Sequence, residues 1–353
     1  MENLEPVELT VGGNEASDLL PVHAPEVLDS YGWRRAFWTV LDEGPVEHSI
    51  ALLGERESGR WDAHLLAAEV PPAVAGRTED AEALAYRDGY IYVIGSHFGA
   101  KRGPLRAKRA FVARFREADA ATAHATHLDV ARNQFRLHRA VNDALRASTV
   151  ESLRPGAGVR DRFITATISR GTAKAKSWVG RIAVHDVPVN VEAAAFTSAG
   201  TLLLGLRYPV SDTGEPLLVE LSDVESLFDA DESTLPEVCA VRVLDGVTPP
   251  GTLTGMRALC AREDGSYDAV VGSIDALGKD SVLLADHPEG GDVTCRHVRF
   301  RLPETAPRVP AEAVLELTGF HNVEGVATVD GTVYYVTDED HRIAIWRYPL
   351  TAA

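Results

Sequence analysis

Cysteine is scarce in this sequence, which contains three in 353 residues: Cys239, Cys260 and Cys295. An odd number of cysteines without metal-type spacing indicates neither a disulfide framework nor a structural zinc site. We therefore expect three reduced thiols, as in a cytoplasmic protein.

Positive charge is also in deficit. Lys and Arg number 35 against 52 Asp and Glu, which gives a net charge of −17. Nucleic acids and anionic membranes bind basic surfaces, so this balance argues against both as partners. Residues 1–6 have neither a basic start nor an apolar run, and no stretch approaches the length of a membrane span. These absences predict a soluble, cytoplasmic protein.

The short motifs of several large enzyme classes are absent as well. The sequence contains no Gly-x-Ser-x-Gly nucleophile elbow, no phosphate-binding loop and no dinucleotide fingerprint. Candidate functional residues must therefore come from a different kind of pattern.

What the chain does contain is a repeated β-hairpin. Its first copy, residues 80–97, reads as an apolar strand, an Asp-Gly turn and a second strand of aromatic and β-branched residues. Further copies occupy residues 190–207 and 322–339, and a looser copy occupies residues 255–273. Repetition of a hairpin at long period is typical of propellers and solenoids.

The repeats share one register. Glu82, Glu192 and Glu324 occupy the same position in their hairpins, and Arg257 takes that position in the looser copy. These anchors are 110, 65 and 67 residues apart, and such uneven spacing favours propeller blades that carry insertions. We predict an all-β protein, a β-propeller of about five to seven blades, in a single domain over residues 1–353.

Segments outside the repeats complete this interpretation. Residues 5–11 can form a short strand, which we expect to close the last blade beside residues 342–348. An unusual first blade, without a clear hairpin anchor, is expected from strands around residues 36–40, 49–53 and 63–66.

One helical insertion is predicted over residues 129–147. Asp129 can cap it, and Val130, Leu137, Val141 and Leu145 fall near one face. We expect this helix to pack on the side or rim of the propeller. Further strands are expected over residues 163–168, 178–184 and 281–285.

A basic loop, residues 101–109, follows the first hairpin in this otherwise acidic chain. Two interpretations stay open. The loop is either a solvated connection to the next strand or an arm that binds an anionic ligand.

The repeated phrases resemble those of the bacterial domain-of-unknown-function family 3616, whose members are predicted β-propellers. The resemblance rests on the phrases that begin at Glu82, Asn190 and Asn322, and it covers about residues 75–350. It implies a fold and no activity. A more distant similarity is to the esterase-like phytase propellers, which suggests metal-assisted hydrolysis of esters or phosphoesters. The sequence departs from the pattern at Arg257, which stands where an acid is usual.

Residues at equal register meet around one axis, because the first strand of each propeller blade lines the central channel. Carboxylates that meet there, together with Asn carbonyls, form the hard-oxygen site that Ca²⁺ prefers. The predicted metal ligands are Glu82, Glu192, Glu324 and Asp338.

The remaining residues near this register have chemistry suited to a substrate. Two arginines can bind a carboxylate or phosphate through paired hydrogen bonds, and a histidine has the intrinsic pKa to move a proton near neutral pH. The predicted substrate-binding residues are Arg207, Arg257, Asn190 and Asn322, and the predicted catalytic residues are His97, Glu82 and Glu192.

A purely structural role for the repeated glutamates stays open, because a buried glutamate can accept hydrogen bonds from strand amides or pair with Arg257. The leading functional hypothesis is a metal-assisted hydrolase of a small anionic ester, lactone or phosphoester, with Ca²⁺ as the expected cofactor. The alternative is a non-catalytic propeller that presents its rim to a protein partner.

Overall fold

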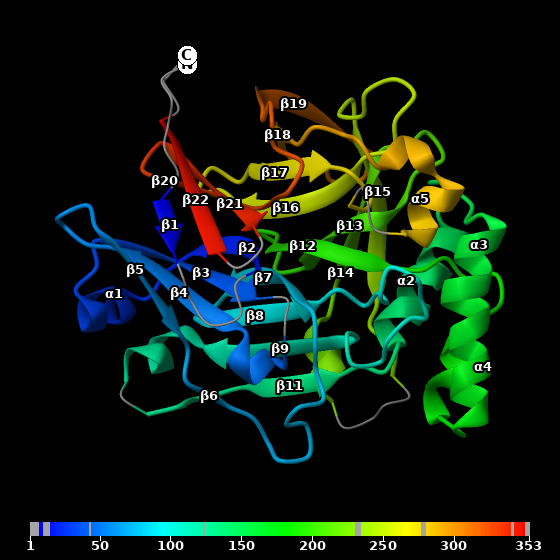
Figure 1. Cartoon of the computed structure of the whole chain (residues 1–353), viewed down its shortest axis with the longest axis horizontal. Helices are drawn as coiled ribbons and strands as arrows, with labels where there is room; N and C mark the ends of the chain where they lie inside the picture. The colour runs from blue at the N-terminus through cyan, green and yellow to red at the C-terminus, as the bar shows by residue number, and fades with distance from the viewer. Residues whose placement is uncertain are drawn as a thin grey trace.

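Antiparallel four-stranded sheets are the repeated unit of this fold, which is seen in a computed structural model (Figure 1). The structure describes residues 7–9, 15–41, 44–122, 124–229, 234–276, 280–339 and 342–349. Within that part of the chain, five such units follow one another.

Each unit is named here by its order in the chain. Unit 1 contains β2 (Ala16–Pro21), β3 (Arg35–Leu41), β4 (Ile50–Glu55) and β5 (Trp61–Leu65). Unit 2 contains β7 (Ala81–Arg87), β8 (Tyr90–Gly95), β9 (Phe111–Arg116) and β11 (Asp129–Arg132). Unit 3 contains β12 (Asn190–Phe196), β13 (Leu202–Val210), β14 (Pro216–Leu221) and β15 (Val238–Asp245).

The last two units follow the same order. Unit 4 contains β16 (Gly255–Ala261), β17 (Tyr267–Gly272), β18 (Arg296–Phe300) and β19 (Arg308–Glu316). Unit 5 contains β20 (Val323–Val329), β21 (Thr332–Glu339), β22 (Arg342–Pro349) and the N-terminal β1 (Val7–Leu9). A parallel pairing of β15 with β19 joins units 3 and 4 at their outer edges, and β6 (Ala68–Glu69) pairs with β10 (Thr126–His127) outside the units.

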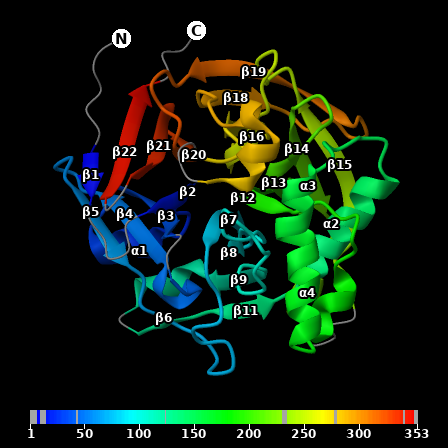
Figure 2. The same cartoon turned by 45° about the vertical axis from the view of Figure 1, so that its right-hand side comes forward.

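The first strands of the units contact one another in a ring. The contacts run from β2 to β7, β12, β16 and β20, and then back to β2. Figure 2 shows the units placed around this ring. Four-stranded sheets around a central axis lined by their first strands are the architecture of a β-propeller, so the predicted fold class is confirmed at this level.

The ends of the described chain close the ring. Strand β1 pairs antiparallel with β22, with Val7 opposite Ile345 and Leu9 opposite Ile343. This pairing confirms the strand expected near the N-terminus and its predicted partner. The described part of that prediction is residues 7–9, since residues 5, 6, 10 and 11 lie outside it.

The repeated hairpins form as their sequences predict. The turn between β7 and β8 has positive φ at both Asp88 (51°) and Gly89 (81°), and the turn between β20 and β21 does so at Asp330 (50°) and Gly331 (71°). Positive φ at both central residues favours Asp-Gly, because glycine adopts it without strain and aspartate tolerates it.

Helices occur chiefly between units 2 and 3, at the right of Figures 1 and 2. This helical flank contains α2 (Arg136–Ala147), α3 (Ala157–Val159), a π-helix (Arg160–Thr165), α4 (Ala166–Ala173) and a 3₁₀ turn (Ser177–Arg181). The other helical segments are α1 (Pro25–Tyr31), α5 (Val282–Asp286) and short 3₁₀ turns at Val46–His48, Glu117–Ala121, Glu225–Phe228 and Pro288–Gly290. None of the described helices has the length and apolar character needed to cross a membrane.

The helix expected over residues 129–147 begins later than predicted. Residues 129–132 are strand β11, which pairs with β9, and α2 begins at Arg136. Leu137, Val141 and Leu145 of α2 are buried against units 2 and 3, which accounts for the apolar period over that part.

The strands expected over residues 163–168, 178–184 and 281–285 are wrong. The first two ranges fall largely in the π-helix, α4 and the 3₁₀ turn of the helical flank, and the third falls largely in α5. Phe163 and Ile164 are completely buried in an apolar cluster with Phe98 and Phe135. The burial of Phe163 and Ile164 in this cluster outweighs the preference of aromatic and β-branched residues for strands.

A buried polar network joins units 4 and 5. Asp268 of β17 is fully buried, and its carboxylate accepts hydrogen bonds from Arg299 (2.7 Å), Arg262 (2.8 Å) and Thr328 of β20 (2.6 Å). Nε2 of His297 lies 3.0 Å from the same carboxylate. Burial would raise the pKa of Asp268, but its hydrogen bonds with His297 and Arg299 hold that pKa well below its usual range.

Candidate functional site

The four anchor residues lie at irregularities in the innermost strands. The pairing register of β7 shifts between Ala81 and Ala83, so that Glu82 is the extra residue. Similar shifts occur at Glu192 of β12, Arg257 of β16 and Glu324 of β20. A β-bulge redirects the side chain of its extra residue, and all four side chains line one cavity on the axis of the ring.

Close approach of the innermost strands shapes this position. A Cβ atom on Gly325, next to Glu324, would come within 2.7 Å of the backbone of Asp18 in β2 and within 2.5 Å of Val336. A glycine is therefore required here, because any side chain would push β20 away from its neighbours.

The central cavity has a volume of about 350 Å³. Its polar lining carries seven carboxylates and four cationic side chains, so negative charge is in excess. The carboxylates are Glu15, Asp80, Glu82, Glu192, Asp275, Glu324 and Asp338, and the cations are Lys101, Arg109, Arg207 and Arg257. Such an excess in a confined space favours the binding of a cation.

Three carboxylates converge most closely. Glu82, Glu192 and Glu324 can each offer one oxygen, and these three oxygens lie within 4.8 Å of one another. All three side chains are buried, with residue exposures of 9%, 4% and 7%. A Ca²⁺ ion holds oxygen ligands at about 2.3–2.6 Å, so ligands of one ion lie at most about 5 Å apart. The three glutamates fit that limit.

Neighbouring side chains fix two of these glutamates. Glu192 accepts hydrogen bonds from Asn190 (2.9 Å) and Arg207 (3.0 Å). Glu324 accepts hydrogen bonds from Arg257 and from Ser17 (3.4 Å). The pairing of Arg257 with Glu324 is the structural role that the sequence left open, and it does not prevent Glu324 from facing the other two glutamates.

Two buried groups at the cavity have unused hydrogen-bonding capacity. Among the described residues, nothing bonds to Oδ1 of Asn190 or to Nε and Nη1 of Arg257. Both residues line the cavity. Buried polar atoms are nearly always satisfied, so these atoms indicate that a ligand or solvent completes the site.

The ionisation of the carboxylates reflects their crowding. Burial raises the pKa of Glu324 to about 7; Arg257 opposes this rise, and Glu192 and Asp338 add to it. Burial likewise raises the pKa of Asp80 to about 6, against the effects of Arg109 and Ser96. The proximity of Glu192 contributes to both shifts. The cavity therefore holds protons near neutral pH that a bound cation would displace.

Arg207 remains charged in this environment. Burial alone would lower its pKa, but Glu192, Glu324 and Asp275 together raise it. Its guanidinium donates to Glu192 and, through Nε, to the backbone oxygen of Ser273 (3.2 Å). Both contacts fix the guanidinium at the cavity wall.

Most of the residues predicted for the site are brought together. Asn190, Asn322, Asp338, Arg207 and Arg257 line the cavity with the three glutamates. The side-chain amide of Asn322 donates to the backbone oxygen of Asp338. From the basic loop, Lys101 and Arg109 reach the cavity, and Arg109 bonds to Asp80 (2.7 Å).

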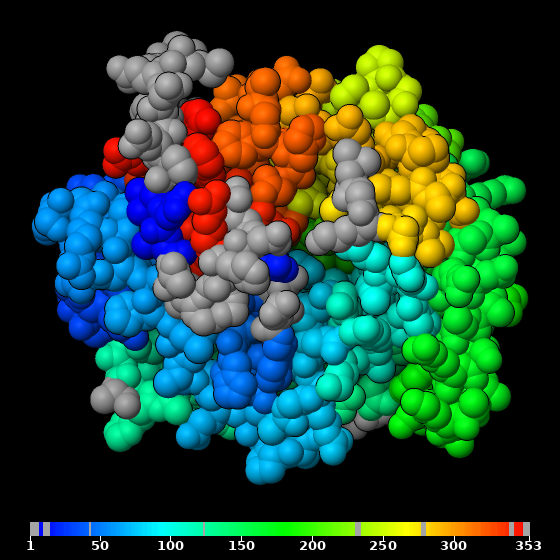
Figure 3. Space-filling model, in the orientation of Figure 1, coloured from blue at the N-terminus to red at the C-terminus, as the bar shows by residue number. Residues whose placement is uncertain are grey.

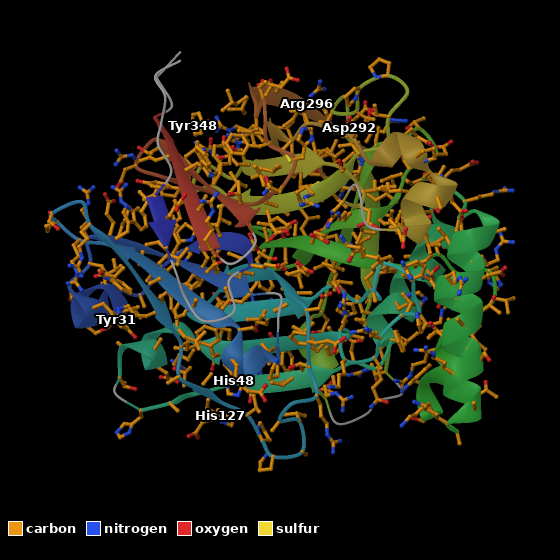
Figure 4. All side chains as sticks on the ribbon, viewed as in Figure 1. Tyr31, His48, His127, Asp292, Arg296 and Tyr348 are labelled. Carbon is orange, nitrogen blue, oxygen red and sulfur yellow. The ribbon has the colours of Figure 1, made fainter. Side chains whose placement is uncertain are left out.

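His97 is not brought to the cavity. It has a positive φ of 59° and is completely buried, with Nδ1 placed 2.7 Å from the backbone oxygen of Gly95 and Nε2 placed 2.7 Å from Nδ2 of Asn133. Burial lowers its pKa to about 4. The ring is part of the wall between β8 and the helical flank, so it does not contact a ligand on the axis. His127, another histidine of the chain, lies at the periphery (Figure 4).

Four polar residues of the cavity have no counterpart among those predicted: Glu15, Ser17, Asp275 and His321. Glu15 and Ser17 come from the start of unit 1, and Asp275 follows β17. Unit 1 was not recognised as a repeat because α1 separates β2 from β3, so the short glycine-containing turn of the other hairpins is missing. No sequence signal distinguished Asp275.

Comparisons with known proteins add little to this site. No family model matches the chain, so the resemblance to family 3616 stays an expectation, and no curated protein matches it. Several solved structures have a similar arrangement. One is a mannose phosphorylase from Leishmania mexicana in complex with phosphate ion, with 11% identity over 98% of this chain and 88% of that chain and a TM-score of 0.41.

Two further structures have similar scores. A GH43 β-1,3-galactosidase with galactodeoxynojirimycin has 11% identity over 94% of this chain and 90% of that chain, with a TM-score of 0.44. The WD40 β-propeller domain of Doa1 has 9% identity over 98% of this chain and 97% of that chain, with a TM-score of 0.37. Scores this low carry no argument about activity, and function must be argued from the cavity itself.

Proposed function

We propose that this chain is a five-bladed propeller enzyme that binds Ca²⁺ in its central cavity and hydrolyses a small anionic ester, lactone or phosphoester there. The observation that carries the proposal is the convergence of Glu82, Glu192 and Glu324 from three innermost strands to within the span of one metal ion. Three separate strands supply these ligands, so the ring itself positions them.

The donor set suits a hard cation. Carboxylate and amide oxygens are the ligands that Ca²⁺ takes, and its flexible coordination number suits a site that also contains Asn190 with an unused oxygen. Mg²⁺ fits less well, because it demands near-ideal octahedral geometry and keeps several waters. A bound divalent cation would polarise a carbonyl or phosphoryl oxygen and lower the pKa of a coordinated water.

The arginines would orient the substrate. Arg207 and Arg257 lie at the wall of the same cavity, and each is already fixed on one side by a glutamate. The free nitrogens of Arg257 can donate to a carboxylate or phosphate oxygen. The excess of carboxylates would repel such an anion, so we expect the anion to bind after the cation has reduced that charge.

Asp80 takes the role that the sequence assigned to His97. It lines the cavity, and its raised pKa of about 6 lets it accept or release a proton near neutral pH. Ser96 and Arg109 both bond to one of its oxygens, Oδ2, which holds the carboxylate in a fixed orientation. We therefore assign Asp80 as the acid–base group of this proposal.

A calcium titration tests the metal site. At pH 8, isothermal calorimetry should show one site per chain, and saturating Ca²⁺ should raise the thermal midpoint, because a ligand present at about 100 times its Kd stabilises the folded state by about 2.7 kcal/mol. Glu82→Gln should weaken binding about 100-fold, since even outer partners of metal ligands contribute about 10–100-fold. Glu15→Gln is the matched control: it removes a carboxylate from the same cavity outside the three-glutamate group, and affinity should stay near that of the parent.

Hydrolysis is then measured on the calcium-loaded protein with chromogenic carboxylic esters, lactones and phosphoesters. Activity should disappear with a chelator and in Glu82→Gln, and persist in Glu15→Gln. Calcium binding without hydrolysis would contradict the enzymatic part alone. Failure to bind Ca²⁺, Mn²⁺ or Mg²⁺ would contradict the metal site and favour the non-catalytic propeller.

Calcium affinity should depend on pH. Glu324 and Asp80 have pKa values raised to about 7 and about 6, so below these values each holds a proton that the cation must displace or tolerate. Calcium affinity should be constant above pH 8. Below the pKa of Glu324, it should fall by about tenfold for each pH unit. Titrations at pH 8, 7, 6 and 5.5 check this. A pH-independent Kd would mean that Glu324 is not a ligand.

A further inference from the structure

The helical flank differs in charge from the rest of the chain. Residues 136–181, which span this flank, contain ten Lys and Arg and three acidic residues, in a protein whose net charge is −17. The exposed helices of this flank form the right-hand side of Figure 3. A local surplus of positive charge on an acidic protein favours an anionic ligand at that position.

A second cavity lies at the base of this flank, and we call it the flank cavity. Its volume is about 810 Å³, within the range of about 300–1,000 Å³ that is usual for small-molecule sites. It lies between the C-terminal half of α2, the segment before α3, and residues 184–187. Its charged and titratable lining consists of Arg146, Arg154, Arg160, His185 and Glu151.

The arginines of the flank cavity are not equivalent. Arg146 bonds to Asp186 (3.0 Å) and to Asp143, so carboxylates already balance its charge. Arg154 and Arg160 have no carboxylate partner among the residues that the structure describes, and Arg160 makes only a long bond of 3.4 Å to the backbone oxygen of Pro155. Two exposed guanidinium groups of the lining are therefore available to a ligand, and Arg146 is already held in position.

We propose that the flank cavity binds a small phosphate monoester. Its dianionic phosphate would receive paired hydrogen bonds from Arg154 and Arg160, because the planar guanidinium matches the geometry of phosphate oxygens. Glu151, the one carboxylate among the lining residues, would face the organic part of the ligand, where it can accept hydrogen bonds from hydroxyl groups. This site is separate from the central cavity and does not depend on the proposed hydrolase function.

The π-helix connects the flank cavity with the surroundings of the central cavity. Arg160 is its first residue, and Phe163 on the same element stacks on Phe98 at a ring-centroid distance of 4.6 Å. Phe98 lines the central cavity. The π-helix thus contributes Arg160 to the flank cavity and, through Phe163, contacts a residue that lines the central cavity.

Calorimetric titration with glucose 6-phosphate and inorganic phosphate tests the site, with citrate as a carboxylate probe and heparin as a polymeric one. We expect saturable binding of both phosphate probes, tighter for the monoester and weaker for citrate. The double variant R154Q/R160Q should lose about tenfold or more in affinity for the monoester.

The matched control is R170Q/K174Q. It removes the same charge from exposed positions on and just after α4, outside the flank cavity, and should bind the monoester like the parent. Circular dichroism and the thermal midpoint verify that both variants fold, as expected for exposed side chains. Equal losses in the two variants, tighter binding of citrate, binding of heparin alone, or no saturable binding at millimolar monoester would each overturn the proposal. None of these results affects the calcium site.

Discussion

Asp268→Asn should lower the free energy of unfolding by about 3–5 kcal/mol, the usual cost of removing one partner from a buried ion pair. The substitution keeps the shape of the side chain and replaces an acceptor with a donor that faces Arg262, Arg299 and Thr328. Because Thr328 belongs to β20, the loss weakens the contact between units 4 and 5. Urea denaturation at pH 7 measures the effect.

The effect of Asp268→Asn should also depend on pH. The pKa of Asp268 is depressed in the folded state, so its contribution to stability is fully present above its unfolded pKa of about 3.9 and is lost as the pH falls below that value toward the folded pKa. The difference in free energy of unfolding between parent and variant should therefore become smaller in the most acidic conditions at which both proteins fold. Asp245→Asn, which removes a half-exposed pair with Arg308, should cost at most about 1 kcal/mol. Similar losses in the two variants would contradict a special role for the buried network.

Arg257→Met should have the second-largest effect, with a loss of about 3 kcal/mol at pH 8. Arg257 is buried beside Glu324, and its charge opposes the rise of the glutamate's pKa. Without it, that pKa rises further. A group with a raised folded pKa contributes stability that is present at low pH and lost as the pH rises through the folded value, so the deficit of the variant should be smaller at pH 5.5 than at pH 8.

Calcium provides a second measurement on the Arg257→Met variant. If the cation binds at the three glutamates, it can replace the missing positive charge and restore part of the lost stability. Arg308→Met removes a half-exposed arginine of similar size and should neither show this pH dependence nor be restored by calcium. If Arg257→Met loses the same amount of stability at pH 5.5 and at pH 8, Glu324 is neutral in the folded protein.

The repeat register was the most informative part of the sequence. It placed Glu82, Glu192, Arg257 and Glu324 on the innermost strands, because residues at one register of equivalent hairpins reach equivalent positions around the ring. The register could not show that Glu324 is already paired with Arg257, since that contact depends on the packing of β20 against β16.

His97 shows where register reasoning fails. It follows β8 at the same spacing from Glu82 at which Arg207 follows Glu192, yet its backbone adopts a positive φ that turns the ring into the wall. A backbone conformation of that kind in a histidine is set by its surroundings, here Gly95 and Asn133, and has no sequence signature.

The part of the helical flank that follows α2 was missed for a different reason. Phe163, Ile164, Thr167 and Ile168 follow a helical spacing, but the run is short and rich in residues that favour strands. What makes it helical is burial of Phe163 and Ile164 beneath Phe98 and Phe135, which are distant in the sequence.

The closure of the ring by β1 and β22 has a consequence for biosynthesis. Val7 and Ile345 are paired in the sheet but are made at opposite ends of the described chain. At translation rates of about 5–20 residues per second, β1 waits on the order of tens of seconds for its partner. During that time the backbone amides and carbonyls of β1 have no native partner. When β22 has been made, its outer edge can pair with another chain until β1 pairs with it. The last step of folding on the ribosome is therefore the step most exposed to aggregation, and we expect nascent chains to depend on chaperones at that stage.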